Sequence, residues 1–259
     1  MKKKLVLKIG TSTLTNSTRL ISRGKIEDLG RQMLELRDEY DIVLVSSGAI
    51  AAAKQYINIK DPGKPVASKQ AMAAIGQPVL MRTYNEVLSD LGIQTAQCLL
   101  TYRDFENETS RRNTLNTITE LIRYSYLPIV NENDTTAVEE ILLGDNDNLS
   151  AQVAVLIKAD LLVLVSDTDG LYDKNPHLHE DAQHIAEVSN IEEAKALVEE
   201  RDSGFGTGGM NSKLEAAMLC QKNGIETRIV GGEGSDFILN ALNEKARSTR
   251  FPAVQVAIS

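Results

Sequence analysis

Two lysines stand where they could bind phosphate groups. Lys8 lies near the end of an otherwise apolar stretch, residues 5–9, where burying an ammonium group is expensive without an anionic partner. Lys213 follows a glycine-rich run, residues 206–209, at the start of a predicted helix. The dipole of that helix disfavours a cation unless a phosphate lies there too. Both positions therefore indicate chemistry on an anion.

A run of carboxylates and amides, residues 144–148, precedes an apolar segment that is typical of a helix. It lacks the spacing and the closing glutamate of a calcium-binding EF-hand loop. A carboxylate between two lysines could hold both in position, in the way that outer-shell groups orient metal ligands. Either Asp145 or Asp147 could take this part.

Polar residues and glycines follow four predicted strands, and each set lies at a strand's carboxyl end. The four segments are residues 8–12, 46–48, 131–134 and 166–167. Ligands of open parallel sheets bind beyond these ends. Gly10 and Gly48 would let backbone N–H groups approach an oxyanion. One such segment could simply start a helix, but four at successive strand ends predict a common anion site.

Two familiar nucleotide motifs are present only in part. Residues 204–209 match the GxGxxG dinucleotide pattern, but the charged residues 199–202 precede them where that pattern requires a strand. Ser212 and Leu214 flank Lys213 where a Walker P-loop has glycine and Ser or Thr. Neither motif is supported by its context.

Short β-branched runs alternate with helical patterns along the chain, which favours a parallel sheet covered by helices. Ser22 can cap the first long helix, and Pro78 is expected to kink an alanine-rich helix over 67–90. Strands are predicted at 5–9, 42–45, 94–100, 127–131, 161–165, 227–230 and 253–258, and further helices at 109–123, after 148, at 210–223 and at 235–246. We find no internal repeat or linker.

Composition excludes several classes of protein. The 259 residues are 42% hydrophobic and 25% charged with a net charge of −8, which argues against nucleic-acid or anionic-membrane partners. We find no run long enough to span a bilayer. Cys98 and Cys220 have no metal-binding spacing and are expected to be buried thiols, and His177, His179 and His184 are expected to be solvated loop residues. A cytoplasmic enzyme fits these features.

Seven segments resemble the motifs of the amino-acid kinase superfamily, in its order and over essentially the whole chain. They are residues 8–12, 45–51, 68–77, 131–134, 144–150, 167–172 and 206–213. The segments at 46–51, 131–134 and 144–148 together are similar to those of the glutamate 5-kinase family. The resemblance implies an α/β fold, a three-layer αβα sandwich with a largely parallel central sheet.

The resemblance also implies a role for each matching residue. The catalytic groups would be Lys8 and Lys213, which stabilise charge on the transferring phosphoryl group, and Asp147, which organises both. The amino-acid site would contain Ser47, Gly48, Ala49, Asn131, Asp134, Asp145 and Asn146, with Asp134 a natural partner for the ammonium. The ATP site would contain Lys8, Gly10, Ser12, Ser166, Asp167, Thr207, Gly208, Gly209, Met210, Asn211, Ser212 and Lys213.

The implied reaction is transfer of a phosphoryl group from ATP, with Mg²⁺, to the γ-carboxylate of L-glutamate as the first step of proline synthesis. An ionised carboxylate needs no general base, so no catalytic histidine is required. We expect one domain over 1–259, with a lobe of about 1–150 for the amino acid and one of about 151–259 for ATP. The resemblance further implies feedback inhibition by proline, a homo-oligomer (dimer or tetramer) and glutamyl phosphate reductase as a possible partner.

Three positions depart from the family pattern. Ser166 stands where threonine is usual, and Ala53 replaces a common glycine. The sequence ends at Ser259, so we expect no C-terminal PUA domain, a module that many relatives carry. This departure leaves oligomer geometry and proline sensitivity open.

Two other interpretations remain. The chain could be a superfamily kinase for N-acetylglutamate, aspartate, carbamate or UMP. Asp134 argues against N-acetylglutamate, because a carboxylate facing the α-nitrogen suits a free ammonium and disfavours an acetylated nitrogen. It could instead be a non-catalytic amino-acid sensor. Lys8 and Lys213 argue against a sensor, which has no use for two phosphate-stabilising cations.

Overall fold

The computed structural model describes residues 2–15, 18, 20–57, 65–137, 146–176, 178–195 and 208–254. Its strands are β1 (Lys3–Ile9), β2 (Tyr40–Ser46), β3 (Gln94–Leu100), β4 (Tyr126–Glu132), β5 (Leu161–Ser166), β6 (Leu171–Tyr172), β7 (His184–Ile185), β8 (Glu226–Gly231) and β9 (Ser248–Phe251). Its helices are α1 (Thr11–Thr15), α2 (Arg23–Leu36), α3 (Ala49–Ala53), α4 (Pro65–Asp90), α5 (Arg103–Glu106), α6 (Glu108–Arg123), α8 (Asp147–Ile157), α10 (Gly208–Lys222) and α11 (Phe237–Leu242).

Seven strands form one sheet in the order β3-β4-β2-β1-β5-β8-β9. Every neighbouring pair is parallel except β8 and β9, which are antiparallel. The central strand β1 pairs with both β2 and β5, so segments from the two halves of the chain share one sheet. The carboxyl ends of the parallel strands consequently lie at one edge.

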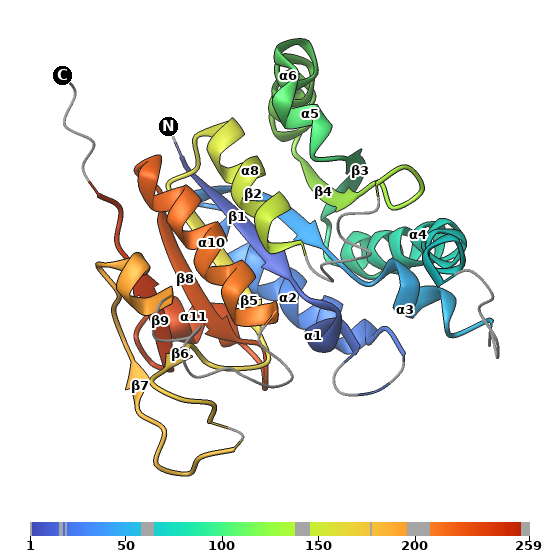
Figure 1. Ribbon diagram of the computed structural model, residues 1–259. Coiled ribbons are helices and arrows are strands. Elements are labelled where there is room, and N and C mark those ends of the chain that lie inside the picture. Colours follow the sequence, from blue (N-terminus) through green and yellow to red (C-terminus); the bar gives the residue numbers. More distant parts are fainter. Residues whose placement is uncertain are drawn as a thin grey trace.

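Helices cover both faces of the sheet, and each face has its own apolar core. One core joins Val6 of β1 to α6, α8 and α10, while the other joins Leu5, Leu7 and Ile9 to α2, α4 and α11. Figure 1 shows α8 and α10 lying together across one face. The alternation of β1 side chains between the two cores is the period-2 pattern of a strand. The predicted three-layer αβα sandwich is therefore confirmed.

Most predicted elements lie within one or two residues of the observed ones, and Ser22 caps α2 as expected, its Oγ accepting from the Lys25 backbone N–H. Helix α4 continues across Pro78. The short helices α1, α3 and α5 and the β6–β7 hairpin were not predicted. Both cysteines are free thiols; Cys220 is buried as expected, whereas Cys98 is only half-buried. Within the described ranges, the helices include none long and apolar enough to cross a membrane.

A strand that was not predicted, β9 (Ser248–Phe251), runs antiparallel to β8. We expected a last strand at 253–258; residues 253 and 254 are not in a strand, and residues 255–258 lie outside the described residues. Thr249 and Phe251 are buried on either side of the more exposed Arg250. The Thr249 hydroxyl accepts from the Leu171 N–H and donates to the Ile185 carbonyl, so it links β9 to both strands of the hairpin. These contacts are distant in sequence, and a four-residue alternation gives little local signal for them.

Helices α3 and α4 pack backbone against backbone at Gly76. A Cβ atom on Gly76 would lie 1.8 Å from the Ala49 carbonyl oxygen and 2.7 Å from the Ala53 backbone nitrogen. Glycine is required here because neither backbone atom can move aside as a flexible side chain would. This close approach places α4 against the segment that follows β2.

We predict that Gly76→Ala separates α3 from α4 and lowers the free energy of unfolding by about 1–3 kcal/mol, the usual cost of overpacking. Gly24→Ala is the matched control, because Gly24 is exposed on α2 and a Cβ there meets only the Ser22 hydroxyl at 3.9 Å. Urea denaturation should show the control unchanged or slightly stabilised. Equal stability of the two variants would contradict the packing argument.

Candidate active site

A buried ion-pair triad lies at the carboxyl end of β1. The Lys8 ammonium is 2.6 Å from Asp147 Oδ1, and the Lys213 ammonium is 3.0 Å from Asp147 Oδ2. The side chain of Asp147 has no exposed surface, while those of Lys8 and Lys213 are 3% and 9% exposed. One carboxylate thus holds two ammonium groups, and the three residues come from three different elements.

The fold explains why these three residues meet. Lys8 is two residues after Val6, so it faces the layer formed by α8 and α10. Asp147 is the first residue of α8, and Lys213 lies in the second turn of α10. Fully buried alanines line the faces of both helices in the shared core, which lets the two helices approach closely. Both side chains therefore reach the end of β1.

The charges of the triad are strongly coupled. Burial alone would raise the pKa of Asp147, but the positive charges of Lys8 and Lys213 outweigh burial and lower that pKa. The carboxylate is therefore ionised at neutral pH. Two cations and one anion leave a net positive charge in a nearly closed site, which suits a phosphate.

The start of α10 adds further contacts to the triad. The Ser212 hydroxyl donates to Asp147 Oδ2 at 2.9 Å. The Lys213 ammonium also donates to the Gly209 carbonyl at 2.9 Å. Both lysine and carboxylate are thereby fixed in orientation, which is the preorganisation that electrostatic catalysis requires.

A hollow of about 260 Å³ opens beside the triad. Its lining combines residues from the ends of β1, β2 and β5 with the start of α10: Lys8, Gly10, Thr11, Ser12, Ser47, Val165, Ser166, Asp167, Gly209 and Lys213. Eight of these ten were predicted site residues. Thr11 and Val165 were not predicted, because neither residue type suggests phosphate chemistry by itself.

Amide side chains next to this hollow form a buried network. Asn146 Nδ2 donates to Asn131 Oδ1 at 2.8 Å and to Ser47 Oγ at 3.1 Å. Gly48 follows with a φ of 110°, a left-handed conformation that favours glycine, and Ala49 begins α3 as a buried residue. These predicted amino-acid-site residues are therefore brought together.

Asp134 lies two residues beyond the end of β4 and is 9% exposed. Burial raises the pKa of its carboxyl to about 6. A cationic partner would stabilise the ionised form of a carboxylate in such surroundings. The ammonium group of a ligand could be that partner.

The predicted nucleotide residues lie on two segments around the hollow. The Ser166 hydroxyl donates to the Asp167 carboxylate at 3.1 Å beyond the end of β5. Gly208, Gly209, Met210, Asn211 and Ser212 form the start of α10. Asn211 Oδ1 is buried, and no described residue donates a hydrogen bond to it. This acceptor is suited to a donor on a bound molecule.

Some predicted positions lie outside the described residues, namely Asp145, Thr207 and His177. His179 is exposed as expected. His184 is not a solvated loop residue: it is half-buried in β7, where its ring packs edge-on against Tyr172 with centroids 5.3 Å apart. The hairpin that buries it gave no clear signal in the sequence.

Two polar residues of α4, Gln77 and Tyr84, bond to residues at the ends of β4 and β2, and neither was predicted as a site residue. Gln77 Oε1 accepts from Asn131 Nδ2 at 2.8 Å. The Tyr84 hydroxyl bonds Ser46 Oγ at 2.9 Å and is fully buried. Isolated polar residues inside an apolar helical pattern were the available signal for them.

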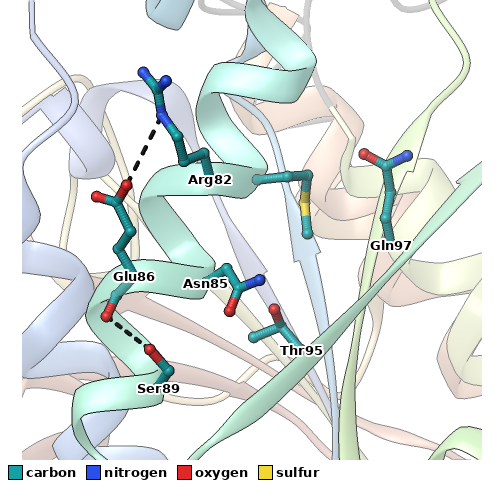
Figure 2. A pocket seen from close by; sticks show the side chains of 7 residues that line it. Arg82, Asn85, Glu86, Ser89, Thr95 and Gln97 are labelled. Carbon is teal, nitrogen blue, oxygen red and sulfur yellow. Dashed lines mark hydrogen bonds and ion pairs between the residues drawn. The ribbon is translucent and has the colours of Figure 1, made fainter.

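A larger hollow of about 550 Å³ lies between α4 and β3, shown in Figure 2. Arg82 and Glu86 form an exposed ion pair on its helical side, and Gln97 stands on its strand side. Its lining brings no group toward the triad. Because convergent charge and not size marks a phosphate site, we identify the smaller hollow as the candidate active site.

The described residues were also searched for side chains that could bind a metal ion. Among the described residues, no group of three or more His, Cys, Asp or Glu side chains could hold a metal ion.

Comparison with known proteins agrees with this geometry. A sequence model of the amino acid kinase family matches residues 3–231. Glutamate 5-kinase from Clostridium acetobutylicum is 45% identical over 250 residues, covering 96% of this chain and 94% of the relative. Glutamate 5-kinase from Streptococcus suis is 42% identical over 253 residues, covering 97% of this chain and 71% of the relative.

A third relative, glutamate 5-kinase from Symbiobacterium thermophilum, is 40% identical, covering 96% of this chain and 95% of the relative. The crystal structure of UMP kinase from Ureaplasma parvum superposes with a TM-score of 0.66 at 19% identity, covering 97% of this chain and 99% of that one. At that identity the superposition supports the fold alone. With the family match spanning most of the sheet and the triad, the chain belongs to the amino acid kinase family.

Proposed function

We propose that this chain is a glutamate 5-kinase, which transfers the γ-phosphoryl group of ATP to the side-chain carboxylate of L-glutamate. The products are γ-glutamyl phosphate and ADP, and the reaction is the first step of proline synthesis. The observation that carries the proposal is the buried Lys8–Asp147–Lys213 triad in a chain 45% identical to a glutamate 5-kinase.

The chemistry requires two anions to approach one another. A carboxylate oxygen of glutamate forms a bond to the γ-phosphorus, and the bond from that phosphorus to the bridging oxygen of ADP breaks. The carboxylate is already ionised at neutral pH, so no residue has to remove a proton. What the site must supply is positive charge and fixed donors around the transferring group.

The triad supplies that charge. Lys8 and Lys213 would contact oxygens of the transferring phosphoryl group, where negative charge is greatest in the transition state. Asp147 would keep both ammonium groups in place before substrates arrive, at 2.6 and 3.0 Å. No reorganisation of the site is then needed during the reaction.

The amino-acid site would lie around Ser47, Asn131, Asp134 and Asn146, with the backbone of Gly48 and Ala49. Asp134 would bind the ammonium of glutamate, whose charge compensates the cost of burying the carboxylate. Asp145 is proposed for the same site from its sequence position alone. A free ammonium suits this site better than an acetylated nitrogen does.

ATP would occupy the hollow from the side of Ser166, Asp167 and the start of α10. Asn211 Oδ1 offers an acceptor there, and Gly10 allows the phosphates to approach the backbone after β1. Mg²⁺ bound to ATP supplies additional neutralisation of the phosphate charge.

Other features of the function remain proposals from the sequence. These are two lobes within one domain, inhibition by proline, a homo-oligomer, glutamyl phosphate reductase as a partner, and a cytoplasmic location. The alternative is that the chain phosphorylates another substrate of the superfamily. A sensor without activity is disfavoured by the intact triad.

The proposal is tested by measuring Mg-ATP turnover with hydroxylamine present, on L-glutamate, N-acetylglutamate, aspartate and UMP. We expect hydroxamate from glutamate alone, because an acyl phosphate reacts with hydroxylamine. Turnover of another substrate instead would move the chain to a different member of the family. Binding of glutamate without any turnover would indicate a sensor.

We predict that Lys8→Ala and Lys213→Ala each lower kcat by about 10²–10³, with much smaller changes in glutamate affinity. Each removes a preorganised charge that acts mainly on the transition state. Lys3→Ala is the matched control on the same strand, because Lys3 is 58% exposed and forms a surface ion pair with Glu39. Near-normal kcat in both active-site variants would overturn the assignment.

We predict that kcat/KM for glutamate falls as the pH is lowered through about 6, because protonated Asp134 no longer attracts the ammonium. Asp134→Asn should show a low kcat/KM without this transition. Since the folded pKa lies above the ordinary 3.8, ionised Asp134 destabilises the fold at neutral pH. The Asn variant should therefore melt higher than wild type above pH 6, and the gain should disappear as the pH approaches 3.8. A flat wild-type profile would contradict this role.

A further inference from the structure

Gln77 lies behind the amino-acid site and has two distinct hydrogen-bonding ends. The side chain is part of α4 and 8% exposed. Its Oε1 accepts from Asn131 Nδ2 at 2.8 Å, and its Nε2 donates to Gln97 Oε1 at 3.0 Å. Gln77 thereby joins a buried residue on β4 to an exposed one on the edge strand β3, which Figure 2 shows at the larger hollow.

Backbone groups fix the orientation of the neighbouring amides. The Glu132 N–H donates to Asn131 Oδ1 at 2.9 Å, and because a backbone N–H can only donate, that atom must be the oxygen. The other end of Asn131 is then the NH₂ group, which needs an acceptor because the residue is 2% exposed. Gln77 Oε1 is the acceptor that meets it.

The same reasoning extends to Asn146. Its Nδ2 donates to Asn131 Oδ1 at 2.8 Å and to the Ser46 carbonyl at 3.2 Å, and a carbonyl can only accept. Its Oδ1 is consequently the remaining end of the amide. This atom is buried and receives no hydrogen bond from the described residues. It is left as an acceptor for a bound molecule.

We propose that Gln77 is a positioning residue for the amino-acid substrate, which holds Asn131, and through it Asn146, so that Asn146 Oδ1 faces a donor of the substrate. The inference rests on the proposed function. Together with the Asp134 carboxylate, this acceptor makes the site suited to a primary ammonium group. Gln77 itself does not touch the reacting atoms.

Packing supports this role for a residue of α4. Gly76, the preceding residue, brings the helix backbone to within van der Waals distance of Ala49 and so sets the height of Gln77 over the site. Without the acceptor on Gln77, the Asn131 NH₂ group would be buried and unsatisfied. The amide would then rotate or recruit water, and the Asn146 contact would loosen.

The test compares Gln77→Met, which removes both hydrogen bonds at similar volume, with Gln77→Glu, which keeps the acceptor for Asn131. Gln77→Met should raise the KM for glutamate roughly tenfold, with kcat and the KM for ATP within about threefold of wild type. Gln77→Glu should recover most of the glutamate affinity. Gln97→Met is the control, since Gln97 is exposed and water can replace it.

A purely structural role would instead lower the melting temperature and affect both substrates equally, and that pattern would overturn the inference. So would an unchanged glutamate KM in Gln77→Met. If Gln77→Met does not fold, the test depends on Gln77→Glu. A wild-type glutamate KM in Gln77→Glu then supports the inference. A glutamate KM raised about tenfold in that variant overturns it. Failure of the proposed function is distinct, because wild-type protein would then form no hydroxamate from glutamate.

Discussion

The contact of one buried carboxylate with two ammonium groups is the constraint on which the site depends. Asp147 has no exposed surface, so its charge is tolerable only because Lys8 and Lys213 lie within 3.0 Å. This contact joins the central strand to two helices of one layer. Any shift of α8 or α10 against β1 would leave a buried charge unpaired, so catalytic geometry and packing of that layer are linked.

The two faces of the sheet contribute differently to the site. The layer of α8 and α10 supplies the charged groups, through Asp147 and Lys213. The opposite layer contributes through α4, which approaches α3 so closely at Gly76 that its Gln77 reaches Asn131. A parallel sheet brings both contributions to one edge because all of its strand ends point the same way. The phosphate and the amino acid can then meet there.

The sequence predicted a large part of this arrangement. Lys8 and Lys213 stood out because a cation in an apolar strand or at a helix start needs an anion, and that reasoning requires only local pattern. The strands around the site were predicted because β-branched runs are clear signals. Strand β9 and the β6–β7 hairpin were not predicted, because their short segments are held by contacts between residues distant in sequence, such as Thr249 with Leu171.

By itself, the sequence determined a parallel sheet with covering helices, the lysines and the set of polar strand ends, since hydrophobic period and the cost of buried charge act locally. Only the tertiary structure decided that Asp147 meets both lysines, that Asp134 is buried enough to raise its pKa to about 6, and that Gln77 supports Asn131. Distances, burial and amide orientation depend on which backbones approach one another. No spacing along the chain specifies those approaches.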